Sequence, residues 1–211
     1  HMRKPGKIIN HGRNYGLGVV KTQEYLSVAG YNFTIADVRE MIHIWKKANK
    51  RTAQWQDEIV ELVRRQSYLQ NPFGRKRWFG GRDYATKALA FLPASTLADI
   101  VFRMMIALRP EKWMEQIHKL GIREYGMLPE GWKQRIQVHD EITCQGPSDT
   151  WEEAVSVLVR IMTQPWPEID NFGLGVEIGW SGRGGSWGSA QRVGVYGPSP
   201  GCAMLFKEDG L

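Results

Sequence analysis

The sequence predicts an α+β fold that is mostly helical and that carries a small antiparallel sheet in its second half. Apolar residues recur at helical intervals over residues 34–49 and again over 52–66. Apolar and polar residues alternate over 132–138 and over 174–180, which is the period of a strand. Helices should therefore dominate the first half of the chain, and short strands should follow position 130.

The composition is that of an ordinary globular protein with a basic surface. The 211 residues are 42% hydrophobic and 24% charged, and the formal net charge is +6. Basic clusters at 3–7, 46–51 and 75–77 favour contact with a polyanion such as nucleic acid. Two cysteines fit a reducing cytoplasm better than a disulfide scaffold. We expect no membrane association, because no apolar run approaches the length needed to cross a bilayer.

Residues 3–16 predict a first helix with a polar face. Pro5 fits a first helical turn, and Gly16 with Gly18 forms a stop signal. Four residues one turn apart then share one face: Arg3, Lys7, His11 and Tyr15. Two cations, an imidazole and a phenol are too polar for a core. A row with this spacing suits a long polyanionic ligand such as a nucleoside triphosphate.

Two helices with core-forming apolar stripes are expected next. Thr34 and Asp37 have the spacing of a capping box at the start of the helix over 34–49, and a second helix covers 52–66. Residues 71–74 then form a turn, and an extended basic and aromatic segment follows it.

The second half begins with a long helix over residues 83–108, which Pro93 should kink or interrupt. A short helix is expected over 112–120. Thr150 and Glu153 have capping-box spacing at the start of a further helix.

Residues 131–145 predict a β-hairpin whose tip carries His139, Asp140 and Glu141. Adjacent carboxylates on a rigid turn can hold a divalent metal. An exposed polar turn without chemistry has the same composition, since Asp is common in turns. Residues 174–180 should add a third strand to this hairpin. The chain beyond Gly182 is rich in Gly, Ser and Pro, and we expect a loose tail there.

Several stretches together resemble the family A DNA polymerases, the DNA polymerase I class, and they are closest in character to phage versions. Residues 3–16 resemble the O-helix, or motif B, and 137–141 resemble motif C. Pro72 to Arg77 is similar to the segment after the fingers helices, and 93–99 to a palm helix. Residues 176–188 are similar to the usual C-terminal end.

The resemblance implies a fingers region over 2–82 and a partial palm over 83–190, followed by a Gly- and Pro-rich tail over 191–211. It also implies nucleotidyl transfer from dNTPs to a primer 3′ end by a two-metal Mg²⁺ mechanism. The partners would be the dNTPs and the DNA primer-template, in the cytoplasm of a bacterial or phage-infected cell.

Particular residues inherit roles from the resemblance. Arg3 and Lys7 would contact the triphosphate and act in catalysis. His11 would face the nucleotide sugar, where relatives usually have Phe or Tyr. Tyr15 and Gly16 would lie near the templating base.

At motif C, Asp140 would bind catalytic magnesium, with Glu141 beside it, and His139 would approach the primer terminus. Arg75 and Arg77 are expected to contact DNA.

A further expectation concerns completeness, since the family's second metal-binding aspartate comes from motif A, upstream of the O-helix. We expect a second polypeptide carrying motif A and the thumb to complete the site, and this chain alone to be inactive. An exposed sheet edge should then make the isolated chain oligomerise, aggregate or depend on a partner.

Two alternatives to a polymerase segment stay open from the sequence. The first is a non-catalytic DNA-binding or interaction module, which the atypical His11 and Ala94 favour. The second is a metal-dependent hydrolase that uses His139, Asp140 and Glu141.

Overall fold

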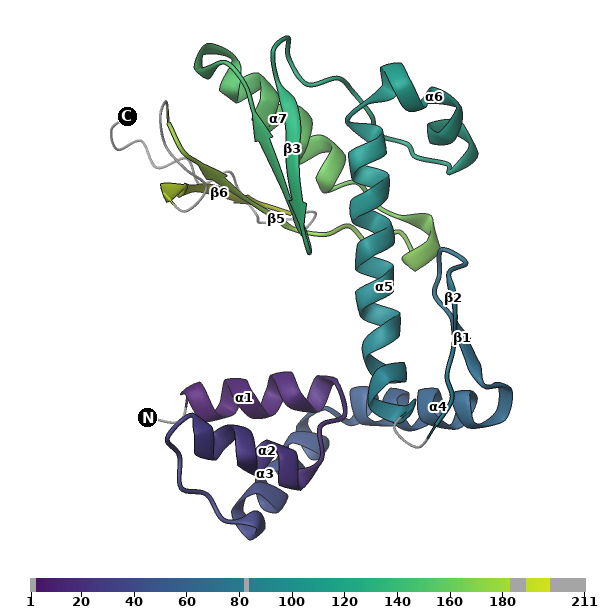
Figure 1. Ribbon diagram of the computed structural model, residues 1–211, viewed down its shortest axis with the longest axis vertical. Helices are drawn as coiled ribbons and strands as arrows, with labels where there is room; N and C mark the ends of the chain where they lie inside the picture. Colours follow the sequence, from purple (N-terminus) through teal and green to yellow (C-terminus); the bar gives the residue numbers. More distant parts are fainter. Residues whose placement is uncertain (1–2, 82–83, 183–188, 198–211) are drawn as a thin grey trace. The chain divides into compact units, whose positions relative to one another are not determined.

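The computed structural model describes residues 3–81, 84–182 and 189–197 (Figure 1). The chain divides into two compact units, His1–Thr96 and Leu97–Leu211. Helix α5 (Tyr84–Ala107) belongs to the first unit at its start and to the second at its end. Helices predominate and every sheet is a small antiparallel pair, so the predicted α+β class is confirmed.

The first unit holds four helices and one short hairpin (Figure 1). The predicted first helix is α1 (Arg3–Asn14), and the two predicted core helices are α3 (Ile35–Ala48) and α4 (Lys50–Gln66). Helix α2 (Val19–Val28) was not predicted. It buries only Thr22 and Leu26, so it lacks the apolar stripe that identifies a helix in sequence.

The core of this unit consists of two clusters. Ile9 of α1 packs with Leu26, Val38 and Ile42 of the next two helices. The second cluster joins α4, the hairpin and the start of α5 through Ile59, Val63, Leu69, Phe79, Ala88, Leu89 and Phe91.

The predicted capping box at the start of α3 is confirmed. The backbone N–H of Thr34 donates to Asp37 Oδ2 at 2.8 Å, and the backbone N–H of Asp37 donates to Thr34 Oγ1 at 3.1 Å. Hydrogen bonds from the Thr34 hydroxyl and backbone lower the pKa of the Asp37 carboxyl. The cap therefore fixes where the chain enters α3.

The expected turn and extended segment form a hairpin of β1 (Tyr68–Gln70) and β2 (Lys76–Trp78). Asn71 organises its loop. The Oδ1 atom of Asn71 accepts the backbone N–H of Phe73 at 3.1 Å and that of Arg75 at 2.9 Å. The Nδ2 atom of Asn71 donates to Ser95 Oγ at 3.2 Å.

Helix α5 runs through Pro93 without interruption, so of the two expected effects of this proline the interruption is absent. Proline removes one backbone hydrogen bond and costs about 3 kcal/mol inside a helix. Buried Leu89 and Phe91 on one side of Pro93, and Ile100 and Val101 on the other, offset that cost.

This helix also corrects an expectation about apolar runs. Its 24 residues, with a mean hydropathy of 1.6 over an 18-residue window, are long and apolar enough to cross a membrane. Core helices have the same property, so length and composition alone do not identify a membrane span.

The second unit contains helices α6 (Pro110–Lys119) and α7 (Trp151–Met162) and two hairpins. Strand β3 (Lys133–Val138) pairs with β4 (Glu141–Gln145), which confirms the predicted hairpin. Short 3-10 turns cover Ser148–Thr150 and Pro167–Ile169. Ile117, Ile161 and Trp166 are fully buried in this unit.

The predicted three-stranded sheet is wrong. Strand β5 (Val176–Trp180) pairs with β6 (Gln191–Tyr196) rather than with the β3–β4 hairpin, from Val176 opposite Tyr196 to Trp180 opposite Gln191. Residues 191–196 were expected to belong to a loose tail. Their alternating Val193 and Val195 supply the partner that β5 needs, despite the surrounding glycines.

The capping box predicted at Thr150 is also absent. Thr150 precedes α7 but makes no side-chain cap. Its hydroxyl oxygen instead accepts the Trp132 Nε1–H at 2.9 Å, and a 3-10 turn holds its backbone at φ −113° and ψ 17°. Residues 183–188, part of the stretch similar to the family's C-terminal end, lie outside the described residues.

Candidate functional site

Helix α1 presents the polar face that the sequence predicted. Arg3, Lys7 and His11 are exposed along it, and Tyr15 lies half-buried just beyond its end. The rings of His11 and Tyr15 meet edge to face, with centroids 5.3 Å apart. Pro5, Ile9 and Arg13 occupy the buried side. The structure therefore brings the predicted nucleotide-binding residues together on one exposed face.

Electrostatics make this face a suitable place for an anion. The first turn of α1 contains no acidic residue, whereas Arg3, Lys4 and Lys7 lie at or near it. The helix dipole already places partial positive charge at that end. The cations therefore repel the dipole in the free helix, and an anionic ligand would relieve the repulsion.

Arg13 fixes the orientation of α1, a role that sequence reasoning missed. Its guanidinium donates to the carbonyl of Leu17 and lies 5.6 Å above the ring of Trp45. Burial lowers the pKa of Arg13, while the charge of Asp57 opposes that shift. The four-residue spacing of Pro5, Ile9 and Arg13 was the available signal.

Two amide side chains complete this attachment. Gln56 of α4 donates through Nε2 to the carbonyls of Arg13 and Asn14, where α1 ends. Asn10 accepts the Nε1–H of Trp45 at 2.9 Å. Because the buried side is held at three points, the exposed face of α1 has a defined direction within the first unit.

The consecutive residues His139, Asp140 and Glu141 of the second unit lie at the tip of the β3–β4 hairpin. Val138 pairs with Glu141, so His139 and Asp140 alone form the turn. His139 adopts a left-handed conformation with φ 53°, and Gln137 Nε2 donates to its carbonyl at 2.6 Å. His139, Asp140 and Glu141 are all exposed. The predicted position of these carboxylates on a tight turn is confirmed.

The tip by itself supplies few metal ligands. Within the part of the chain that the structure describes, no group of three or more His, Cys, Asp or Glu residues could hold a metal ion. An exposed carboxylate such as Asp140 provides the hard oxygen that Mg²⁺ prefers. Among the described residues, Asp140 can thus provide one ligand of a metal site.

The base of the same hairpin is firmly anchored. Gln134 Nε2 donates to the carbonyl of Met105 at 3.1 Å, and Trp132 lies 6.3 Å from Trp180, centroid to centroid. A Cβ atom on Gly146 would come within 2.2 Å of Trp132 Cγ, so only glycine fits there. Burial raises the pKa of the nearby Cys144 thiol to about 11.

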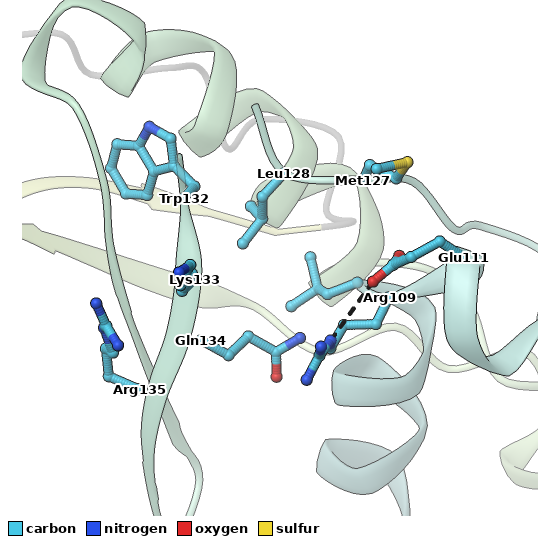
Figure 2. Close-up of a pocket in the computed structure, with 9 residues that line it drawn as sticks. Arg109, Glu111, Met127, Leu128, Trp132, Lys133, Gln134 and Arg135 are labelled. Carbon is cyan, nitrogen blue, oxygen red and sulfur yellow. Dashed lines mark ion pairs between the residues drawn. The ribbon is translucent and has the colours of Figure 1, made fainter. Parts of the chain in front are cut away.

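A cavity of about 320 Å³ lies at this base, and Figure 2 shows the side chains that line it. Arg109 and Glu111 form an ion pair at its edge, with Nε and Oε1 3.6 Å apart. Lys133 and Arg135 come from β3, while Met127 and Leu128 come from the segment before it. None of the predicted site residues lines this cavity.

The β1–β2 hairpin carries the two arginines that were expected to bind DNA. Arg75 ends the loop, with its backbone held by Asn71. The guanidinium of Arg77 lies 5.3 Å from the ring centroid of Phe79 and 6.0 Å from that of Phe91. Both arginines are exposed, and both lie in the first unit together with α1.

Comparison with known proteins gives a consistent result across nearly the whole chain. The family described as DNA polymerase family A matches residues 1–188. The chain is 28% identical over 200 residues to a thermostable DNA polymerase I of Thermus thermophilus, covering 90% of this chain and 21% of the relative. It is 24% identical over 173 residues to the mitochondrial DNA polymerase I B of Oryza sativa subsp. japonica, covering 78% and 15%.

A solved structure has a similar fold. It is the POL domain of Pol1 from M. smegmatis, in complex with DNA primer-template and dNTP. The TM-score is 0.60 at 18% sequence identity, over 77% of this chain and 27% of that one. The present chain spans between 15% and 21% of the length of these two curated relatives.

Proposed function

The chain belongs to DNA polymerase family A, and we propose that it provides the nucleotide-binding helix and one of the metal ligands of a template-directed DNA polymerase. The observation that carries this proposal is the exposed stripe of Arg3, Lys7 and His11 on α1, held in place by the buried Arg13. The polymerase would transfer nucleotides from dNTPs to a primer 3′ end.

The α1 stripe would bind the incoming nucleotide. Arg3 and Lys7 lie one turn apart, so their charges can meet successive phosphates of a triphosphate. Neither residue needs to give up an ion pair with a carboxylate in the described part of the chain. His11 and Tyr15 would lie beside the sugar and the base. The stripe would therefore stabilise negative charge on the phosphates during transfer.

The β3–β4 tip would contribute to the metal site. Asp140 would be a direct ligand, Glu141 would lie beside it, and His139 would approach the primer terminus. Magnesium, when bound, neutralises charge on the attacking and leaving oxygens in a two-metal reaction. Asp140 alone is too few ligands for two ions, so further carboxylates would come from a segment outside the described residues.

We propose that a segment equivalent to motif A and the thumb supplies the missing carboxylate, on a second polypeptide or elsewhere in a longer chain. In this arrangement residues 2–82 would act as fingers and 83–190 as part of the palm. The primer-template would be contacted by His139, Tyr15, Gly16, Arg75 and Arg77. The outer edges of β3 and β4 would be available to pair with the completing segment, so the isolated chain should tend to associate.

Nucleotide titration by calorimetry tests the stripe. We expect the full chain to bind dATP more tightly with magnesium than without it. Lys7→Ala should weaken binding about 10- to 100-fold, which is the usual value of a hydrogen bond to a charged group. Lys4→Ala is the matched control, because Lys4 is exposed on the same helix but lies off the stripe. Equal losses in the two variants would contradict the assignment.

Primer extension tests Asp140 as a metal ligand. The assay uses the chain together with an added polypeptide that carries motif A and the thumb. Asp140→Ala should abolish extension in that complex. Asp149→Ala removes another exposed carboxylate of the same unit and should leave extension unchanged. Full activity of Asp140→Ala would refute the proposed metal ligand.

The second candidate is a non-catalytic DNA-binding module. The isolated position of Asp140, with no cluster of three candidate ligands among the described residues, favours it. Such a module should bind DNA but show no magnesium-dependent affinity for dATP. The same titration therefore separates the two functions. The hydrolase alternative rested on the tip residues and the basic charge, and the family membership replaces it.

A further inference from the structure

The outward face of the β1–β2 hairpin exposes a large aromatic side chain among cations. The register places Tyr68 opposite Trp78 and Gln70 opposite Lys76, so these four side chains share one face. Trp78 is 71% exposed, and its ring lies 5.0 Å from that of Tyr68, centroid to centroid. Lys76 Nζ lies 5.6 Å from the centroid of Tyr68. We call these four residues the hairpin platform.

The other face of the hairpin packs against the core. Leu69 is 1% exposed and belongs to the same cluster as Phe79 just beyond β2. Arg77, opposite Leu69, lies over Phe79 and Phe91. Because a strand can turn only one face inward, the core side fixes the platform outward.

The sequence around the platform is rich in positive charge. Residues 62–81 contain five cations, Arg64, Arg65, Arg75, Lys76 and Arg77, and no carboxylate. Glu61 pairs with Arg64 and Arg65 at 2.8 and 3.4 Å. Within the described part of the chain, no carboxylate pairs with Lys76 or Arg77. This excess of positive charge favours the binding of a polyanion over the binding of a protein surface that has few acidic residues.

We propose that the hairpin platform binds single-stranded DNA, with a base stacked on Trp78 and an adjacent phosphate near Lys76. An exposed indole offers a flat face, and unpaired bases have free faces to stack on it. The bases of a duplex are already stacked on each other, so a duplex would gain only the phosphate contact. This inference rests on the proposed function, because a template-directed polymerase meets unpaired template.

Fluorescence anisotropy of a labelled oligothymidine of about 12 nucleotides, within the usual site size, tests the proposal with the full chain. Trp78→Ala should weaken binding about 5- to 140-fold, the usual loss when one stacked base loses its aromatic partner. Trp78→Phe should keep most of the affinity. Lys76→Gln should lower the salt slope by about 0.7, as expected for one phosphate contact on a single strand.

Trp113→Ala is the matched control, since Trp113 is 42% exposed on α6 in the other unit. It should bind oligothymidine like the unchanged chain. Circular dichroism would verify that each variant is folded. A blunt duplex should bind Trp78→Ala and the unchanged chain equally.

The proposal is overturned if Trp78→Ala binds oligothymidine within twofold of the unchanged chain, or if Trp113→Ala loses as much. It is also overturned if Trp78→Ala weakens duplex binding as strongly as single-strand binding. The magnesium-dependent titration with dATP is read separately, so a failed platform and a failed polymerase assignment give different results.

Discussion

Replacing Asn71 by alanine should loosen the β1–β2 hairpin by an amount that can be worked out from its contacts. Asn71 is 3% exposed, and the hydrogen bonds of its side chain include those to the N–H groups of Phe73 and Arg75 and to Ser95 Oγ. A net value of about 1 kcal/mol for each gives a loss of about 3 kcal/mol. Water can reach the two freed N–H groups, so the loss should stay between about 2 and 4 kcal/mol.

Native-state hydrogen exchange is the appropriate assay, because a chain with two units has no single unfolding free energy. The Phe79 N–H, which bonds to the Ser67 carbonyl at 2.8 Å, reports opening of the hairpin. Its protection factor should fall by about 30- to 700-fold, at 1.4 kcal/mol for each factor of ten. Amides of α7 in the other unit should keep their protection.

A control variant separates the loop contacts from the contact to α5. Asn71→Asp keeps an oxygen for the two loop N–H groups but loses the donor to Ser95, and its charge must be accommodated at a buried position. We expect an intermediate loss, because the neighbouring basic residues favour the charge. A change of less than threefold in Asn71→Ala would refute the reasoning that Asn71 holds the loop.

Three further predictions concern other sites. Because the hydrogen bonds from Thr34 lower the pKa of Asp37, the cap should be complete above the unfolded pKa and be lost as pH falls through the lower folded value, measured by exchange at the start of α3. Burial raises the pKa of Cys144 to about 11, so alkylation at pH 8 should be about a hundredfold slower than for an ordinary thiol, in a variant whose other cysteine is serine. Gly146→Ala should cost about 1–3 kcal/mol through its clash with Trp132, measured by native-state hydrogen exchange of the amides paired between β3 and β4, and a neutral result would show that the indole moves freely.

Much of the helical architecture follows from local sequence rules. The four-residue stripe predicted α1, and the Thr34 and Asp37 spacing predicted the cap of α3. Alternation around residues 132–138 predicted the β3–β4 hairpin. Each of these signals depends on residues close together in the chain, which is why the sequence alone discloses them.

The failures depend on contacts between distant residues. Strand β6 lies among glycines, and only its pairing with β5 makes it a strand. Thr150 was predicted to cap a helix, but its hydroxyl oxygen accepts a hydrogen bond from Trp132, which lies 18 residues away in the chain. Helix α2 buries too little apolar surface to show a stripe.

The candidate site shows the same division. Its exposed residues were predictable from their spacing on α1 and at the hairpin tip. The attachment of α1 through Arg13 and Gln56 was not, because those contacts join positions about 40 residues apart. A buried arginine among apolar neighbours cannot be distinguished from a surface arginine by composition.

Because the β3–β4 hairpin is attached at its base, the position of Asp140 depends on the orientation of that base. Strand β3 has six residues, so the tip lies roughly 20 Å from the anchored end. Over that lever arm, a rotation of about 3° at the base displaces the tip by about 1 Å, enough to slow a positioned reaction severely. Substitutions around Trp132 and Gly146 can therefore alter the geometry at Asp140 without touching it. Under the proposed role of Asp140, substitutions at the base of the hairpin should therefore affect primer extension as well as substitutions at the tip.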